Sequence, residues 1–173
     1  MKLATIGVGN AGSKVIDRMI EFEHDTGRDL CRHSLVINTA RTDLAKPEYV
    51  PEDRRVLIGE THMKAKGHGV GGDAAIGAEV AQQDIDEIRR IFDDVEIHEV
   101  DAILVAAGLG GGTGSGAGPV VIEELQPMYD EPVYGLGMLP GKDEGGRPAR
   151  NAARPRHSFV RKLDHFLPLA HAA

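Results

Sequence analysis

The sequence predicts a three-layer α/β fold in which a doubly wound, mostly parallel sheet has helices on both faces. Short apolar runs recur along the chain, and longer segments with helical spacing lie between them. Because a parallel sheet is buried on both faces, its strands are continuous apolar runs, and each crossover to the next strand needs a helix. The predicted strands are Lys2–Ile6, Ser34–Asn38, Arg55–Ile58, Ala102–Ala106 and Val133–Leu139.

Three segments between these runs have the spacing of amphipathic helices. Gly12–Glu23 repeats apolar side chains on one face, and Asp73–Val95 does so over a longer stretch with charged residues outside. The third helix is predicted at Pro119–Met128, with Pro119 in the first turn, where its missing N–H is tolerated.

The composition is that of a soluble globular protein of one domain. The 173 residues are 41% hydrophobic and 27% charged, and no apolar run approaches the ~20 residues of a membrane span. Cys31 is the single cysteine, so an intrachain disulfide is excluded and a half-buried structural thiol is expected. The N-terminus lacks the basic flank of a signal peptide, and together these features indicate a cytoplasmic location.

Charge is spread unevenly along the chain. The net charge is −7, with 14 basic and 26 acidic residues in 1–146 (14 − 26 = −12) and 6 basic and 1 acidic residue in 147–173 (6 − 1 = +5). An acidic body does not suit a nucleic-acid surface, which needs a basic footprint. The division predicts a main domain over 1–146 and a basic C-terminal helix or tail over 147–173.

The first glycine-rich segment is Gly7-Val8-Gly9-Asn10-Ala11-Gly12, a G-x-G-x-x-G that follows a strand and opens a helix. Glycine lets the backbone approach a phosphate, and the helix start offers free N–H groups with a partial positive charge. The pattern alone also fits a tight turn without a ligand.

The second segment, Gly108-Leu109-Gly110-Gly111-Gly112-Thr113-Gly114-Ser115-Gly116, follows the Ala102–Ala106 strand. This many glycines carry an entropic cost that an ordinary turn does not need. Consecutive amides can wrap an anion, and the hydroxyls of Thr113 and Ser115 can donate to phosphate oxygens.

A third segment, Gly67–Asp73, precedes the long charged helix. Asp73 is placed to cap that helix, and its carboxylate can also hold a magnesium-bound water. Loops after parallel strands gather at one edge of the sheet, so the three segments are expected to form one crevice for a polyphosphate.

These segments resemble the N-terminal GTPase part of the tubulin/FtsZ superfamily. The second matches the family signature G-G-G-T-G-[ST]-G, and the others follow in the family's order. Asn38–Leu44 resembles its second nucleotide loop, Gly67–Asp73 its terminal-phosphate loop and Leu139–Arg147 its ribose loop. The likeness extends over residues 1 to about 166 and is greatest to the archaeal CetZ group, tubulin-like proteins linked to cell shape.

The resemblance implies that GTP or GDP binds with Mg²⁺ at the sheet edge and that copies of the chain, or full-length paralogues, polymerise head to tail. It assigns the ribose contact to Glu144 and further contacts to Asn38 and Asp73, the latter reaching the metal through water at most. The phosphate contacts that it implies are Gly9, Asn10, Ala11, Gly12, Ser13, Lys14, Gly110, Gly111, Gly112, Thr113 and Gly114.

The sequence also departs from the family. Its 173 residues do not include the central helix, the second domain or the carboxylate-bearing loop that activates water in the next subunit's site, so no catalytic residue is assigned. From Leu167 to Ala173 the likeness is lost, where residues that recognise guanine are expected. A truncated or frame-disrupted product and an independent short relative both fit these departures, and slow GTP hydrolysis is expected in either case.

Other functions explain less of the sequence. An NAD-dependent oxidoreductase would need an acidic residue at the end of the second strand, which ends in Asn38-Thr39. A Walker-type NTPase would need G-x-x-x-x-G-K-[ST], and His62, His68 and His98 lack the spacing of a metal hydrolase. A non-catalytic module that regulates a filament remains an alternative.

Overall fold

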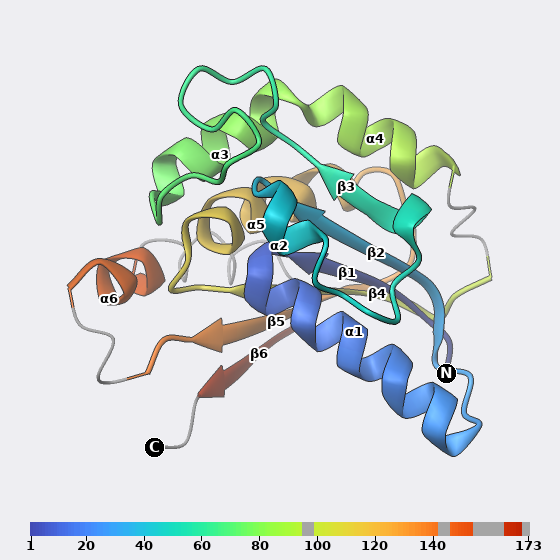
Figure 1. Ribbon diagram of the computed structural model, residues 1–173. Coiled ribbons are helices and arrows are strands. Elements are labelled where there is room, and N and C mark those ends of the chain that lie inside the picture. Colours follow the sequence, from blue (N-terminus) through green and yellow to red (C-terminus); the bar gives the residue numbers. More distant parts are fainter. Residues whose placement is uncertain (95–98, 142–145, 154–164, 171–173) are drawn as a thin grey trace.

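A computed structural model describes residues 1–94, 99–141, 146–153 and 165–170 (Figure 1). The described residues form a six-stranded sheet in the order β3-β2-β1-β4-β5-β6, and every strand pairs in parallel with its neighbours. The predicted three-layer parallel fold is confirmed. The strands are β1 Leu3–Val8, β2 Cys31–Asn38, β3 Arg55–Leu57, β4 Ala102–Gly108, β5 Val133–Leu139 and β6 His165–Ala170.

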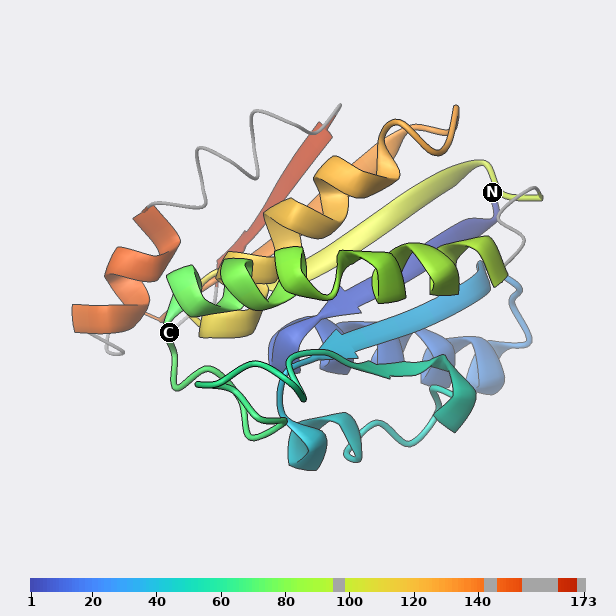
Figure 2. The same ribbon diagram turned by 90° about the horizontal axis from the view of Figure 1, so that it is seen from above.

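Helices cover both faces of this sheet. Helix α1 lies on one face, whereas α3, α4 and α5 lie on the other (Figures 1 and 2). The remaining short elements, α2, the 3₁₀ turn η1 and α6, lie in connections between strands. The bounds are α1 Gly9–Thr26, α2 Arg41–Leu44, η1 Glu52–Arg54, α3 Ala74–Gln83, α4 Ile85–Asp94, α5 Gly112–Leu125 and α6 Gly146–Ala153.

The core has two parts, one on each side of the sheet. The larger part lies under α3, α4 and α5 and includes Ile103, Leu109 and Phe92. The smaller part lies under α1 and includes Ile16 and Val36. Because both faces of the central strands are buried, β1 and β4 are apolar except for the buried Thr5 of β1, as the sequence predicted.

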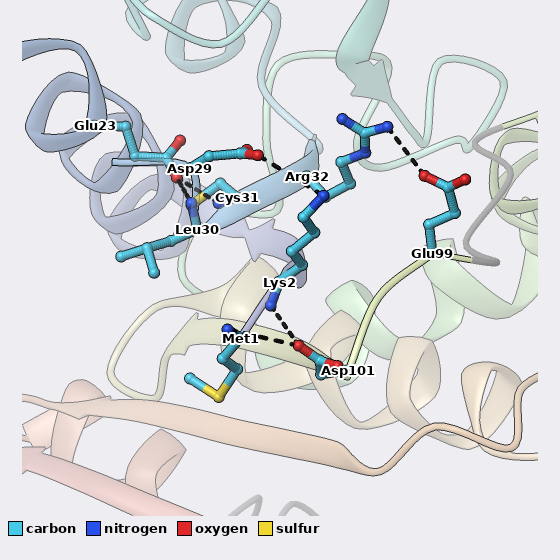
Figure 3. Close-up of polar contacts among 9 residues, drawn as sticks. All are labelled: Met1, Lys2, Glu23, Asp29, Leu30, Cys31, Arg32, Glu99 and Asp101. Atoms are coloured by element: carbon cyan, nitrogen blue, oxygen red, sulfur yellow. Dashed lines mark hydrogen bonds and ion pairs between the residues drawn. The ribbon is translucent and has the colours of Figure 1, made fainter. Parts of the chain in front are cut away.

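Polar contacts close the amino end of the strands (Figure 3). The carboxylate of Glu23 in α1 accepts hydrogen bonds from the backbone N–H groups of Leu30 and Cys31. Asp101, just before β4, accepts one from the backbone N–H of Lys2 at 2.7 Å. These contacts hold the starts of the strands in place. The loops at the opposite, carboxyl end of the sheet are therefore the place to look for a site.

The predicted helix over Asp73–Val95 is wrong as a single element, because it is two helices divided at Asp84. Asp84 has φ −101° and ψ 24°, and its carboxylate accepts the backbone N–H of Gly59 at 2.6 Å. Its own carbonyl accepts from the backbone N–H groups of Glu87 and Ile88. A contact distant in sequence therefore ends one helix and begins the next, and hydrophobic periodicity does not reveal it.

The predicted glycine loop over Gly108–Gly116 is largely helix. Helix α5 begins at Gly112, so Pro119 lies inside the helix and not in its first turn. The glycines are helical because α3 packs against them at backbone distance. A Cβ on Gly116 would lie 2.1 Å from the carbonyl oxygen of Ala74, and one on Gly77 would lie 2.4 Å from that of Gly112.

Strand β6 was not predicted. It pairs with β5, and Gly137 is the partner of Pro168. Proline is accepted there because β6 is the edge strand of the described sheet, where one side of the backbone needs no partner. No helix in the described part of the chain is long and apolar enough to cross a membrane.

Candidate functional site: a pocket at the carboxyl ends of the strands

Two helices begin at the centre of the sheet edge. Helix α1 starts directly after β1, and Gly9 has φ +72°, a left-handed value that favours glycine. Helix α5 starts four residues after the end of β4. The two starts touch, since a Cβ on Gly9 would lie 2.9 Å from the backbone nitrogen of Gly114.

Neither of these two helices has a side-chain cap on its first turn. The N-cap positions are Val8 for α1 and Gly111 for α5, and neither makes a side-chain capping hydrogen bond within the described residues. In contrast, the Asp73 carboxylate caps α3 by accepting from the N–H groups of Ala75 at 2.9 Å and Ile76 at 3.3 Å. The uncapped N–H groups and the partial positive charge at the starts of α1 and α5 are available to an anion.

The end of β2 contributes a buried amide side chain. Asn38 is 2% exposed, and its Oδ1 accepts the backbone N–H groups of Thr39 at 2.8 Å and Ala40 at 3.3 Å. These bonds fix which end of the amide is the oxygen, so Nδ2 is the remaining donor. It has no partner within the described residues, which is costly for a buried donor unless a ligand or water accepts from it.

The third glycine segment is attached to this strand end by backbone hydrogen bonds. The N–H of Gly69 donates to the carbonyl of Thr39 at 2.9 Å, and the N–H of Arg41 donates to the carbonyl of Gly67 at 2.9 Å. Gly67, Gly69, Gly71 and Gly72 all have positive φ angles between 58° and 92°. The segment therefore needs glycine to follow the strand end closely.

Together these segments enclose a pocket of about 450 Å³. Its walls are the starts of α1 and α5, the segment from Asn38 to Asp43, and the third glycine segment from His68 to Gly72. Lys14 supplies a cation, and the carboxylate of Asp43 pairs with Lys46. The expectation that the glycine-rich segments containing Asn10 and Thr113 lie at the same edge of the sheet is confirmed.

Most of the residues that the sequence singled out line this pocket. Those in the lining are Gly9, Asn10, Ala11, Lys14, Asn38, Gly111, Gly112, Thr113 and Gly114.

The other predicted site residues lie outside the lining. A Cβ on Gly12 would meet the carbonyl oxygen of Ala106 at 2.2 Å, and one on Gly110 would meet Pro140 at 2.9 Å, so both glycines permit close packing. Ser13 is buried and lies beside a neighbouring cleft of about 340 Å³, and its Oγ has no partner in the described part of the chain. Asp73 caps α3, and Glu144 falls outside the residues that the structure describes.

Helix α6 fastens two of the pocket's loops from outside. Asn151 donates from Nδ2 to the carbonyls of Gly72 at 2.7 Å and Gly110 at 3.1 Å. Arg147 donates to the carbonyl of Gly71 at 2.8 Å. Sequence reasoning missed Asn151, and no local pattern could have found it because its partners are 79 and 41 residues away.

Thr39 is a second residue that sequence reasoning did not single out. It is completely buried, and its Oγ1 lies 2.7 Å from Oγ1 of Thr113. Its position directly after the predicted end of the second strand was the signal that could have identified it.

Among the described residues, no three His, Cys, Asp or Glu side chains gather to form a metal site. Burial, followed by the nearby charge of Glu23, raises the pKa of Cys31 to about 11, so this thiol stays protonated at neutral pH. The half-buried position expected for this thiol from the sequence is confirmed.

Comparisons with known proteins agree with this geometry. The model of the Tubulin/FtsZ family, GTPase domain, matches residues 2–171. Tubulin-like protein CetZ1 of Haloferax volcanii is 50% identical over 167 residues, which cover 96% of this chain and 42% of that protein. Tubulin-like protein CetZ of Pyrococcus furiosus is 38% identical over 173 residues, covering 98% of this chain and 44% of that protein.

Solved structures give the same result. The GDP-bound monomer of CetZ1 from Haloferax volcanii has a TM-score of 0.94 and 49% identity, covering 98% of this chain and 51% of that chain. The GTPγS-bound protofilament of CetZ2 from the same organism has a TM-score of 0.91 and 40% identity, covering 98% and 49%.

The chain spans less than half the length of the curated relatives that it matches. The family model nevertheless covers almost all of its residues, including the three glycine segments and the unpredicted sixth strand. The chain therefore belongs to the tubulin/FtsZ family and corresponds to its GTPase domain.

Proposed function

We propose that this chain binds GTP or GDP, with Mg²⁺, in the pocket between the starts of α1 and α5. One observation carries the proposal: two helix starts without side-chain caps meet in one pocket that also contains the unpartnered Nδ2 of Asn38. Backbone N–H groups at helix starts suit phosphates, and a third donor suits a ligand that extends past both helices.

The phosphate contacts fall to the first turns of the two helices. The N–H groups of α1 near Asn10 and those of α5 near Thr113 donate to phosphate oxygens, and Lys14 adds charge. Gly12, Ser13 and Gly110 contribute to the phosphate contacts through their backbone. The ribose contact of Glu144 follows from the family resemblance.

Mg²⁺ bound with the nucleotide neutralises part of the phosphate charge. Among the described residues no cluster of acidic side chains could hold it, so phosphate oxygens and water would be its ligands. The Asp73 carboxylate caps α3 and would contact the ion only through a water molecule.

The preference for guanine and the cellular role rest on the family. The relative in the protofilament is described as GTPγS-bound, and the CetZ1 monomer as GDP-bound. We infer a cytoplasmic protein whose role is GTP-dependent assembly, head to tail with its own copies or with full-length paralogues, in cell shape or division.

Competition binding tests this function. We expect GTP and GDP to displace a fluorescent guanine nucleotide from the 173-residue protein at lower concentrations than ATP or NAD. Tighter binding of NAD would overturn the proposal in favour of a dinucleotide-binding domain, in which Asn38 replaces the acidic residue that usually binds the ribose.

Hydrolysis is a separate question, because the family resemblance places the water-activating carboxylate in a loop outside these 173 residues. We propose that the chain alone binds GTP but hydrolyses it very slowly. Hydrolysis needs both stabilisation of the phosphate charge and a positioned water molecule, and the chain alone supplies only the first. Phosphate release by the purified protein measures this. Rapid turnover without a partner would contradict it.

A further inference from the structure

Thr39 makes a hydrogen bond to each of three segments that line the pocket. Its N–H donates to Oδ1 of Asn38 at 2.8 Å, its carbonyl accepts the N–H of Gly69 at 2.9 Å, and its Oγ1 pairs with Oγ1 of Thr113 at 2.7 Å. The side chain is completely buried. It joins the end of β2, the third glycine segment and the first turn of α5.

The hydroxyl pair restricts how Thr113 can act. Thr113 is 9% exposed and lines the pocket. When Thr39 donates to Thr113, the hydrogen of the Thr113 hydroxyl is directed to a different acceptor, and a phosphate oxygen in the pocket is such an acceptor. Removal of the Thr39 hydroxyl leaves Thr113 free to rotate and leaves a buried oxygen with one partner fewer.

We propose that Thr39 is a positioning residue that couples the Gly67–Asp73 segment to the first turn of α5. This inference rests on the proposed nucleotide binding and goes further, because it assigns to Thr39 the discrimination between triphosphate and diphosphate. Both coupled parts line one pocket, and they already touch, since a Cβ on Gly112 would lie 2.7 Å from the backbone nitrogen of Asp73. A longer polyphosphate contacts more of both parts.

The coupling affects the affinity of a ligand according to how many of these segments its phosphates contact. A diphosphate held by the touching starts of α1 and α5 needs only those two helices in place. A triphosphate that also reaches the Gly67–Asp73 segment needs that segment to be correctly positioned relative to α5. Thr39 adds two hydrogen bonds between these parts, one from its side chain to Thr113 and one from the N–H of Gly69 to its carbonyl.

The test replaces the hydroxyl and leaves the shape of the side chain. Thr39→Val removes the hydroxyl, and Thr39→Ser restores it. Thr5→Val is a matched control, because Thr5 is 1% exposed and its Oγ1 pairs with Oγ of Ser34 at 2.9 Å in β1 and β2, outside the pocket lining. The readouts are the Kd values for GTPγS and GDP.

We expect Thr39→Val to weaken GTPγS about 10-fold and GDP less than about 3-fold, as the loss of one buried hydrogen bond predicts. Thr39→Ser is expected to recover the wild-type ratio, and Thr5→Val to keep it despite a lower thermal stability. Equal weakening of both ligands by Thr39→Val, no weakening, or no recovery by Thr39→Ser would overturn the proposal.

Hydrogen exchange of the Gly69 N–H, without nucleotide, separates this inference from the proposed function. If the coupling holds, Thr39→Val and Thr113→Val both speed exchange at Gly69, because each removes half of the hydroxyl pair, and Thr5→Val does not. If wild-type protein binds no nucleotide, the proposed function fails, and this measurement still decides the coupling. Unchanged exchange at Gly69 in both variants would refute it.

Discussion

Individual glycines of the pocket differ in what a side chain at each position would meet. A Cβ on Gly112 would lie 2.6 Å from Cγ2 of Val70 and 2.7 Å from the backbone nitrogen of Asp73. At Gly111, the adjacent residue, the nearest atom is 3.9 Å away, and φ is −83°. The same chemical change is therefore expected to affect stability very differently at two neighbouring positions.

We predict that Gly112→Ala lowers the free energy of unfolding by about 2–3 kcal/mol, because backbone atoms of the third glycine segment must move. Gly111→Ala is the matched control, and its stability should stay within about 0.5 kcal/mol of wild type. Urea unfolding measures both. Similar stabilities for the two variants would contradict the close approach at Gly112.

The sequence identified these residues because glycine-rich segments after strands have few other uses. It did not separate the glycines that face a ligand from those that allow packing. Gly12 and Gly110 were assigned to phosphates together with Gly112 and Gly114, but only the latter two line the pocket. That distinction depends on which segments pack against each glycine, and a local pattern does not contain this information.

At the scale of elements, α3 and α5 are held together by glycine. The two helices lie side by side over the sheet (Figure 2), and Gly116 of α5 approaches the backbone of Ala74 and Ala78 in α3. This packing makes a helix out of residues that the sequence presented as a loop, and it places the start of α5 at the pocket.

We predict that Gly116→Ala separates α3 from α5 and costs about 2–3 kcal/mol, which lowers the Tm by roughly 5–10 °C for a chain of this length. Ala75→Ser, on the exposed side of α3, is the control and should change the Tm little. Thermal unfolding followed by circular dichroism gives the answer. A Gly116→Ala variant as stable as the control would show that the helices can move apart freely.

Element type was predictable where a strand is buried on both faces, as for β1 and β4. Prediction failed where a contact between residues distant in sequence determines the bounds or the type of an element. Asp84 divides the long helix through its bond to Gly59, and β6 joins the sheet through its pairing with β5. Pro168 concealed β6 because proline is compatible with a strand only at an edge.

At the scale of the whole molecule, one side of the sheet near its edge remains apolar and partly open. Leu167 and Leu169 of β6 are 56% and 53% exposed. Their partners in register are Leu136 and Met138 of β5, which pack in the core part on the α1 side. Exposed apolar side chains gathered on a sheet favour association.

We predict concentration-dependent self-association of the isolated chain and a marginal thermal stability. Substitution of both exposed leucines, Leu167→Lys with Leu169→Lys, is expected to shift the protein to monomer in sedimentation velocity, because like charges repel on the exposed face. Arg32→Lys, in β2 and away from β6, serves as a control. A wild-type monomer with a sharp, concentration-independent transition would contradict this prediction.

The central claim is that the first turns of α1 and α5 bind the phosphates of one nucleotide. A crystal structure of the 173-residue protein with GTPγS and Mg²⁺ tests it most directly. The account predicts phosphate oxygens within hydrogen-bond distance of backbone N–H groups near both Asn10 and Thr113. Phosphates bound at only one of these helix starts, or away from both, would contradict it.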